Sequence, residues 1–282
     1  MEETGLNIQE IEYLIDHAFQ EDIGNGDITT NNLIPESTVA KATMTAKADG
    51  VIAGLPIAEK VFRKLDPDLS WKAKIKDGDF VRKGDVFLEI SGSFRALLTG
   101  ERLALNLMQR MSGIATETAK HVNEVTGTKV KILDTRKTVP GLRSLDKYAV
   151  KMGGGTNHRI GLYDMVMIKD NHIKIAGSIT NAVEQIRKAV PAEIKVEVET
   201  TNLNEVEEAV MAGADIIMLD NMSNGMMTKA VELINGKAQV EASGNMTKER
   251  LAGVAATGVD FISIGALTHS VKALDISQNI VL

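Results

Sequence analysis

The second half of the chain contains four short apolar stretches that decide its fold: Ile194-Lys195-Val196-Glu197-Val198, Asp215-Ile216-Ile217-Met218-Leu219, Gln239-Val240-Glu241-Ala242 and Phe261-Ile262-Ser263-Ile264. They recur at a nearly constant spacing, and the segments between them have the period of amphipathic helices. Asn204 and Glu207 stand in capping-box spacing at the start of a helix that reaches residue 212, and Thr247 is a typical N-cap for a helix over 248–256. This alternation of strands and helices predicts a parallel sheet or barrel.

Two further strands are predicted on the N-terminal side of these four, over residues 130–133 and 165–168. The total is about six strands, fewer than the roughly eight of a complete barrel. We therefore predict an incomplete parallel α/β barrel, assigned to residues 113–269.

Residues 39–90 follow a different pattern, with short alternating stretches separated by glycines. Two strands joined by tight turns are predicted over 76–81 and 83–88. The rhythm is similar to that of biotinyl or lipoyl carrier domains, but the exposed lysine turn of a carrier is missing. We expect residues 1–112 to form an N-terminal β-rich α/β sandwich, with the tail 270–282 packing back on it. The chain is then α/β, or α+β overall.

A helix is predicted over residues 99–111, where Leu103, Leu107, Met108 and Met111 recur at helical spacing. Arg102 stands near the start of this predicted helix. An arginine there opposes the helix dipole unless an anion compensates it, although a solvated surface arginine is the simpler alternative.

The composition excludes several classes of protein. The 282 residues suffice for one large domain or two smaller ones. A net charge of −6 and an aromatic content of 4% argue against nucleic-acid binding. The absence of cysteine excludes disulfides, thiolate nucleophiles and Cys-based zinc sites. The acidic start of the chain and the lack of a long apolar run predict no membrane contact and a cytoplasmic location.

The ends of the predicted strands carry the chemistry, because the carboxyl ends of parallel strands face the active site. A cationic group follows the early strands: Arg136, Lys137, His158, Arg159 and Lys169. Such a cluster in an acidic protein implies an anionic ligand, and solvated loop charges are the alternative. His158 taken alone is also consistent with a structural role, and for His172 we favour a structural role, in which it caps or buttresses the strand of Lys169.

Carboxylates and small residues follow the later strands. Glu199 and Asp220 could hold Mg²⁺, accept hydrogen bonds from sugar hydroxyls, act as a general base, or pair with the cations. Ser243-Gly244-Asn245 and Gly265-Ala266 follow the last two strands, where barrel enzymes often bind phosphate through backbone N–H groups. The triplet Gly153-Gly154-Gly155 is more typical of a tight turn.

At these residues the sequence resembles the quinolinate phosphoribosyltransferase family, also called nicotinate-nucleotide pyrophosphorylase (carboxylating). The resemblance extends from about Glu21 to near the C-terminus. It is carried by these segments: Glu21-Asp22-Ile23-Gly24 with Gly26-Asp27-Ile28-Thr29, Gly100-Glu101-Arg102-Leu103-Ala104-Leu105-Asn106, Asp134-Thr135-Arg136-Lys137-Thr138, Gly153-Gly154-Gly155 with Asn157-His158-Arg159, Ile168-Lys169-Asp170-Asn171-His172, Val196-Glu197-Val198-Glu199, Met218-Leu219-Asp220-Asn221 and Glu241-Ala242-Ser243-Gly244-Asn245.

The resemblance implies a reaction between phosphoribosyl pyrophosphate and the ring nitrogen of quinolinate that yields nicotinate mononucleotide, pyrophosphate and carbon dioxide for NAD biosynthesis. It also implies Mg²⁺ and a head-to-tail homodimer, or a higher oligomer, in which Arg102 reaches the partner's active site. The implied substrate-binding residues are Arg102, Thr135, Arg136, Lys137, His158, Arg159, Lys169, Glu199, Asp220, Ser243, Gly244, Asn245, Ile264, Gly265 and Ala266. Of these, Lys137, Glu199 and Asp220 are expected to be catalytic, and Glu199 and Asp220 to lie by the metal.

Two other functions remain open at this point. A sugar-phosphate barrel enzyme, such as an indole-forming synthase, would share the phosphate site but would not explain the cations. A non-catalytic relative that binds an oxyanion, or serves metal-cofactor transport, would share the fold. The intact set Arg136, Lys137, Arg159, Lys169, Glu199 and Asp220 favours catalysis.

Overall fold

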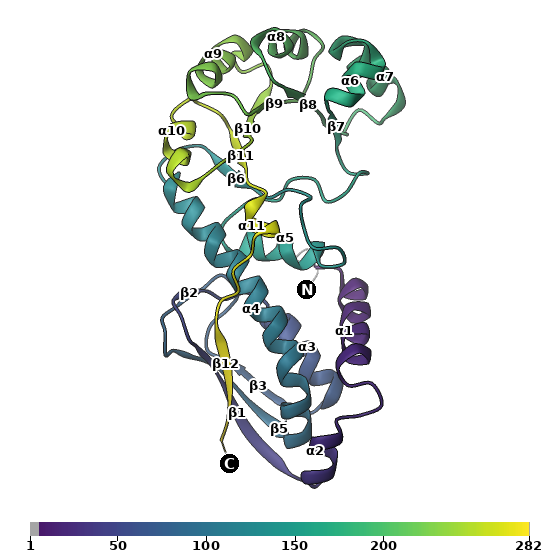
Figure 1. Cartoon of the computed structure of the whole chain (residues 1–282), viewed down its shortest axis with the longest axis vertical. Coiled ribbons are helices and arrows are strands. Elements are labelled where there is room, and N and C mark those ends of the chain that lie inside the picture. Colours follow the sequence, from purple (N-terminus) through teal and green to yellow (C-terminus); the bar gives the residue numbers. More distant parts are fainter. Residues whose placement is uncertain (1–5, 282) are drawn as a thin grey trace. The chain divides into compact units, whose positions relative to one another are not determined.

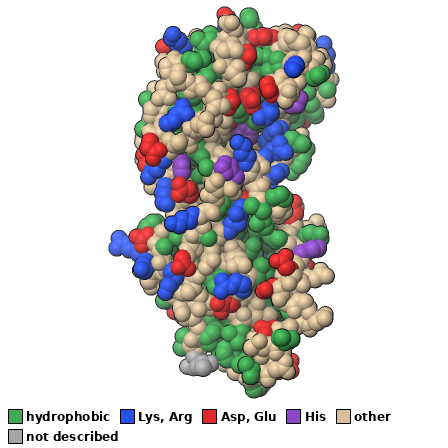
Figure 2. Space-filling view, in the orientation of Figure 1, with side chains coloured by type: hydrophobic (Ala, Val, Ile, Leu, Met, Phe, Trp, Pro, Cys, Tyr) green, Lys and Arg blue, Asp and Glu red, His purple; other side chains and the backbone are tan. Residues whose placement is uncertain are grey.

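The computed structural model describes residues 6–281, which form two compact units. The first unit contains the chain up to Ala119, the segment Thr138–Gly154 and the chain from Leu267 on. The second contains Lys120–Lys137 and Gly155–Ala266. The predicted division of the chain at residue 113 places Thr138–Gly154 with the barrel instead, and it stays a prediction. Lys, Arg, Asp and Glu side chains are exposed on the visible face of each unit (Figure 2). In the described part of the chain, no helix is long and apolar enough to cross a membrane.

The second unit is built on a six-stranded parallel sheet. Its strands, in spatial order, are β6 (Lys131–Leu133), β11 (Phe261–Ser263), β10 (Gln239–Ser243), β9 (Ile216–Asp220), β8 (Val196–Thr200) and β7 (Val166–Ile168). Among the described strands, β6 and β7 are the two edges, so the barrel is open. The predicted incomplete parallel barrel is confirmed.

Helices cover the outer side of this curved sheet (Figure 1). They are α6 (Asp170–Ala176), α7 (Ile179–Ala189), α8 (Leu203–Met211), α9 (Asn224–Ile234), the 3₁₀ turn η2 (Lys248–Arg250) and α10 (Leu251–Ala255), and α11 (Ala266–His269) follows β11. Alternate strand residues such as Val198, Ile217 and Ala242 are fully buried. Since side chains alternate between the two faces of a strand, Glu197 and Glu199 share one face of β8, and Glu241 and Ser243 share one face of β10.

Two predicted helix starts need correction. Helix α8 begins at Leu203, and its N-cap is Asn202, whose side chain accepts from the Glu205 N–H at 3.0 Å. Asn204 and Glu207 have the same spacing as Asn202 and Glu205, so spacing alone selected the wrong pair. Thr247 does stand at an N-cap position, but its side chain accepts no capping hydrogen bond, and the predicted helix is divided into η2 and α10.

The first unit contains a four-stranded antiparallel sheet in the order β12-β1-β5-β3, together with the short pair β2-β4. These strands are β1 (Val39–Ala46), β2 (Gly50–Val51), β3 (Ser70–Ala73), β4 (Phe80–Val81), β5 (Val86–Ser93) and β12 (Ile276–Val281). Residues 76–79, predicted as strand, form a turn in which the Asp79 N–H donates to the Lys76 carbonyl at 3.1 Å. The C-terminal strand β12 pairs along β1.

The helices of the first unit are α1 (Ile8–Asp22), α2 (Ile28–Leu33), α3 (Leu55–Leu65), α4 (Phe94–Glu124) and α5 (Arg143–Met152). Helix α4 has 31 residues, far more than the predicted 99–111. Arg102 is therefore well inside the helix, and the prediction that it stands near a helix start is wrong. The local reason is that Ala96 and Leu97 are buried, so apolar packing continues the helix toward β5. The Arg102 side chain is 61% exposed.

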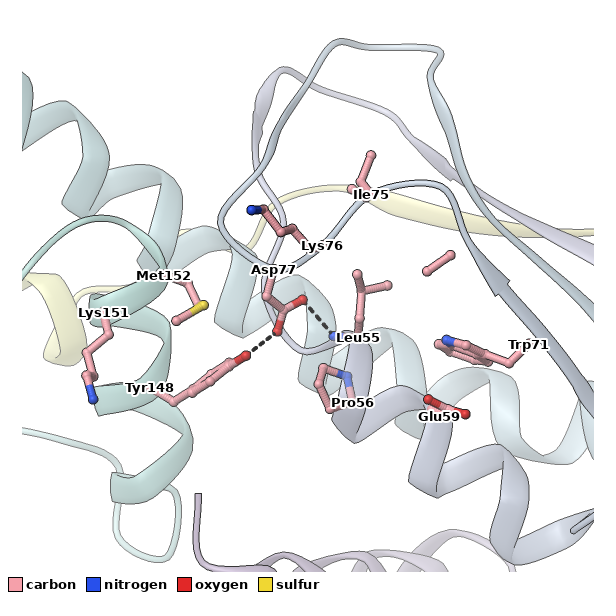
Figure 3. A pocket seen from close by; sticks show the side chains of 11 residues that line it. Leu55, Pro56, Glu59, Trp71, Ile75, Lys76, Asp77, Tyr148, Lys151 and Met152 are labelled. Carbon is pink, nitrogen blue, oxygen red and sulfur yellow. Dashed lines mark hydrogen bonds between the residues drawn. The ribbon is translucent and has the colours of Figure 1, made fainter. Parts of the chain in front are cut away.

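Asp77 caps helix α3 from a distant turn (Figure 3). Gly54, the residue before the helix, has no side chain, and Asp77 accepts from the Gly54 and Leu55 N–H groups at 2.8 and 3.0 Å. The Tyr148 hydroxyl donates to the same carboxylate at 2.8 Å, which ties α5 to the turn. Burial raises the pKa of Asp77 above its ordinary value although these hydrogen bonds lower it. The two side chains line a hollow of 480 Å³ in the first unit.

We predict that Asp77→Ala lowers the free energy of unfolding by about 2–4 kcal/mol, because α3 loses its cap and the hydroxyl of the buried Tyr148 loses its acceptor. Tyr148→Phe should lower it by only about 1 kcal/mol, because Asp77 keeps its two backbone donors. Chemical denaturation of the single and double variants measures both values. If the two single effects simply added in the double variant, Asp77 and Tyr148 would not stabilise the unit through one common interaction.

Candidate active site

A buried carboxylate fixes the segment that leads into the site. Asp134 follows β6 and is fully buried. It accepts from the Asn157 side-chain amide at 2.5 Å and from the His158 backbone N–H at 2.9 Å. Thr156 forms a parallel bridge with Leu133, and its N–H donates to the Ile132 carbonyl at 2.8 Å. The segment 156–158 is thereby attached along the end of β6.

Arg159 and Arg136 lie near each other, and each closely follows in the chain a residue of the clamp formed by Asp134, Asn157 and His158. The pKa of Arg159 is lowered by burial and by the charge of Arg136, while the charge of Glu197 acts in the opposite direction. The Arg159 guanidinium donates to the Met165 carbonyl at 3.3 Å and contacts the Met167 sulfur at 3.6 Å. Two neighbouring, half-buried arginines repel each other, so their arrangement favours an anion as ligand.

His158 points at two buried glutamates. Its Nε2 lies 3.0 Å from Glu197 Oε2 and 3.2 Å from Glu241 Oε2. The side chains are 7% exposed for His158, 0% for Glu197 and 1% for Glu241. Within the described residues, no well-aligned hydrogen bond reaches the four oxygens of the two carboxylates or His158 Nε2, so these atoms meet as a close charge contact.

Protons must compensate these buried charges in part. Burial lowers the pKa of His158, but its contacts with Glu197 and Glu241 outweigh burial and raise it to about 10. Burial and the charge of Glu241 raise the pKa of Glu197 to about 7. The Arg159 N–H donates to His158 Nδ1 at 2.8 Å, so Nδ1 is an acceptor and Nε2 carries the ring proton. Because Nδ1 accepts a hydrogen bond, the raised pKa belongs to the coupled trio, and its proton lies on the Nε2 side of the ring, facing Glu197.

The same hydrogen bond bears on metal binding. His158 Nε2 and a carboxylate oxygen from each of Glu197 and Glu241 lie within 4.8 Å of one another, a grouping that could surround a metal ion. A histidine ligates a metal through a nitrogen that carries no proton. With Nδ1 occupied by the Arg159 N–H, Nε2 has no lone pair to offer. The trio is therefore better suited to sharing protons than to binding a metal.

The predicted cation Lys169 and the predicted carboxylate Glu199 form an ion pair. Lys169 Nζ donates to Glu199 Oε2 at 2.7 Å between the neighbouring strands β7 and β8, and the side chains are 44% and 16% exposed. His172 Nδ1 accepts from the Lys169 backbone N–H at 2.9 Å. The structural role of His172 beside Lys169 is confirmed.

The loops after β9 and β10 support each other. Asn221 adopts φ 55° and donates to Asp220 Oδ2 at 2.8 Å, and its side-chain oxygen accepts from the Asn245 amide at 3.1 Å. Gly244 adopts φ 88°, and a Cβ there would collide with the Asn221 side chain. Arg250 donates to the Asn245 carbonyl at 2.9 Å. Only glycine allows this close approach of the two loops.

The remaining predicted residues have the following positions. Thr135 Oγ1 accepts from the Lys137 N–H at 3.0 Å, and Lys137 is exposed. The Ile264 N–H donates to the Leu133 carbonyl at 3.0 Å, which places Gly265 and Ala266 just beyond the β11 and β6 ends. Arg102 belongs to the first unit. The binding and catalytic roles of all these residues stay predictions.

Three residues of structural importance lie within the motifs that carry the family resemblance, but the motifs predict no role for them: Asp134, Glu197 and Glu241. The sequence contains one signal that the two glutamates are unusual, because strands buried on both faces are normally continuous apolar runs. A glutamate between two buried residues, as in Val196-Glu197-Val198 and Val240-Glu241-Ala242, breaks that rule. The partner of such a charge cannot be read from local sequence.

The second unit is an open parallel barrel, and its strand ends carry clustered cations, the Lys169–Glu199 ion pair and glycine-containing loops. These features define an α/β enzyme that acts on anionic substrates. Residues 27–112 match the N-terminal domain of quinolinate phosphoribosyl transferase, and residues 114–279 match its C-terminal domain. The chain belongs to the quinolinate phosphoribosyltransferase family.

Individual relatives agree with this assignment. The chain is 46% identical over 277 residues to a probable nicotinate-nucleotide pyrophosphorylase [carboxylating] of Bacillus subtilis, covering 98% of this chain and 96% of that protein. It is 48% identical to the chloroplastic protein of that name in Arabidopsis thaliana, covering 96% and 83%. The crystal structure of NadC from Streptococcus pyogenes is 43% identical and superposes with a TM-score of 0.94, covering 97% of each chain.

We predict that Asp134→Asn increases amide exchange at His158 by roughly tenfold or more, because an asparagine can accept only one of the two bonds and presents a donor to the other. Asp164→Asn is the matched control. Asp164 accepts in the same way from the Ile160 and Gly161 N–H groups, at 2.7 and 2.8 Å. Its replacement should affect those amides and leave His158 protected. Unchanged exchange at His158 in Asp134→Asn would contradict the clamp.

Proposed function

We propose that the chain transfers the phosphoribosyl group of phosphoribosyl pyrophosphate to the ring nitrogen of quinolinate, with loss of carbon dioxide, to give nicotinate mononucleotide and pyrophosphate for NAD biosynthesis. Family membership over almost the whole chain supports this reaction. The observation that carries it is the pair of neighbouring arginines, Arg136 and Arg159, at the strand ends of an acidic protein.

The cations account for the pyridine substrate. Quinolinate carries two adjacent carboxylates, and arginine binds a carboxylate through two parallel hydrogen bonds. In this proposal Arg136, Arg159 and Lys169 neutralise the dianion, and His158 lies beside Arg159 in the chain. The Arg159 guanidinium then orients the ring nitrogen toward the sugar, so that much of the catalysis is positioning.

The carboxylates and the glycine loop account for the other substrate. Ser243, Gly244 and Asn245, with Gly265 and Ala266, would bind the 5′-phosphate through backbone N–H groups. Glu199 and Asp220 would stabilise the anomeric carbon as pyrophosphate leaves and positive charge develops there. The proposed catalytic Lys137 is exposed and would contact the departing pyrophosphate.

Asp220 suits Mg²⁺ better than Glu199 does. Hard cations prefer carboxylate oxygens, and the Asp220 carboxylate at the end of β9 accepts from the neutral Asn221 amide at 2.8 Å rather than from a cation. One oxygen of Glu199 already accepts from the Lys169 ammonium. When bound, Mg²⁺ would stabilise the negative charge of pyrophosphate.

The last bond to break is the one between the ring and the carboxylate next to the nitrogen. Once ribosylated, the ring nitrogen is cationic and stabilises the electron pair that stays on the ring carbon when carbon dioxide leaves. That carbon then takes a proton from water, so the step needs no dedicated protein base. A variant that accumulates the undecarboxylated nucleotide would contradict this step.

We also propose a homodimer in which Arg102 enters the partner's site. The 61% exposure of Arg102 on α4 is compatible with such a role. Large apolar side chains are exposed near the β7 edge of the second unit, at Leu162, Tyr163 and Ile175, and such a patch is typical of an interface. Assembly beyond the dimer and a cytoplasmic location remain parts of the proposal.

The function is tested with pure protein, quinolinate, phosphoribosyl pyrophosphate and Mg²⁺, following nicotinate mononucleotide and carbon dioxide together. Both products should form only when every component is present. Neither product from folded protein would favour a non-catalytic, anion-binding relative instead.

We predict that Gly244→Ala raises the KM for phosphoribosyl pyrophosphate about tenfold or more, because the new Cβ displaces Asn221 and strains a backbone with φ 88°. The KM for quinolinate should change by less than about threefold. Gly225→Ala is the matched control, since it lies in α9 with open space around it. Equal changes in both KM values would contradict a phosphate role for this loop.

We predict that Arg102→Ala and Lys169→Ala each lose most activity while staying folded. After subunit exchange, a mixture of the two should recover up to about one quarter of the native activity, because each mixed dimer regains one intact site. Steady-state assays measure the recovery, and labelled subunits confirm exchange. Exchange without recovery would contradict a shared site.

A further inference from the structure

Two glutamates from separate strands converge on one imidazole nitrogen. Glu197 is on β8 and Glu241 on β10, and β9 lies between these strands. Their Oε2 atoms lie 3.0 and 3.2 Å from His158 Nε2. Each glutamate precedes a site residue by two positions on the same face of its strand, Glu199 on β8 and Ser243 on β10. The trio therefore lies directly beneath the strand ends.

Both ring nitrogens of His158 and its backbone N–H lie against polar partners. Its N–H donates to Asp134 at 2.9 Å, which fixes the main chain to the end of β6. Its Nδ1 accepts from the Arg159 N–H at 2.8 Å. Its Nε2–H is therefore the proton that faces Glu197 and Glu241. One side chain thus connects the ends of β6, β8 and β10.

The ring in turn fixes Arg159. A rotated imidazole would remove the acceptor of the Arg159 N–H, and the backbone that carries the guanidinium would lose its anchor. The guanidinium itself has weak anchors, a carbonyl at 3.3 Å and a sulfur at 3.6 Å, and it lies next to the like charge of Arg136. A cation placed against repulsion needs a rigid support to keep one orientation.

We propose that Glu197 and Glu241 are positioning residues for the pyridine dicarboxylate: together they hold the His158 ring through Nε2–H, and the ring holds Arg159 in the orientation that receives a substrate carboxylate. Neither glutamate touches the substrate in this scheme. The inference rests on the proposed function, because it assigns Arg159 to quinolinate.

The test compares loss of the acceptor with its conservation. Glu197→Leu and Glu241→Leu remove an acceptor at nearly the same volume, whereas Glu197→Gln and Glu241→Gln keep a side-chain oxygen that can accept from Nε2–H. Met218→Leu is the matched control, because Met218 is a buried, apolar residue of β9 on the same face as the glutamates. KM and kcat are measured for both substrates.

The leucine variants should raise the KM for quinolinate about tenfold or more, with the KM for phosphoribosyl pyrophosphate within about threefold of the native value. The glutamine variants should return the KM for quinolinate to within about threefold. Met218→Leu should leave both values near native. A merely structural role would change both KM values together and would not be rescued by glutamine.

Two outcomes would overturn the inference while the reaction itself stands. One is a native KM for quinolinate in folded leucine variants. The other is a KM increase in the glutamine variants that equals the increase in the leucine variants. If the native protein does not convert quinolinate at all, the proposed function fails instead, so the two failures are distinguishable.

Nitrogen-15 NMR of labelled histidine in the native protein provides a measurement that does not depend on variants that fold. We expect His158 to carry its proton on Nε2 and none on Nδ1. A proton on Nδ1 would overturn the scheme. A stoichiometric metal in the purified protein that is lost in Glu197→Gln would overturn it too, because a metal needs the unprotonated Nε2.

Discussion

The carboxylate of Asp134 is the interaction on which the second unit depends. It is fully buried, and it accepts one hydrogen bond from a side chain and one from the main chain of the segment 156–158, which lies along the end of β6. A buried carboxylate with fixed donors directs them more strictly than apolar packing can. Through that segment, Asp134 determines where His158 and Arg159 lie, and the glutamates of β8 and β10 then complete the arrangement.

Charge is arranged in two layers in this unit. At the strand ends, Lys169 pairs with Glu199, and the arginines stand side by side. Beneath them, the imidazole and the two glutamates form a second, buried layer. Buried ionic groups seldom add stability compared with apolar residues of similar size, so their presence is better explained by the orientation they impose. These buried charges therefore lower the stability of the folded unit, and in return they hold the substrate-binding side chains in one orientation.

Periodicity predicted the strands of the barrel to within about two residues, because apolar alternation and the carboxyl-end rule are local properties. The predictions failed where a local pattern had two solutions, as with Asn202 and Asn204, or where packing extended an element, as in α4. His172 was interpretable because its partner is three residues away. The partners of His158 are far away in the sequence, on strands whose neighbours only the folded sheet determines, so no local pattern could reveal them.

The pairing of β12 with β1 has a consequence for synthesis on the ribosome. The strand that completes the first sheet comes from the far end of the described chain, while β1 is among the first elements to emerge. Until β12 has left the exit tunnel, one edge of β1 is unpaired, and such edges invite pairing with other chains. In the second unit, β6 is likewise without its neighbour β11 until that strand has been made. The nascent protein should thus depend on protection of its first sheet until β12 has been made.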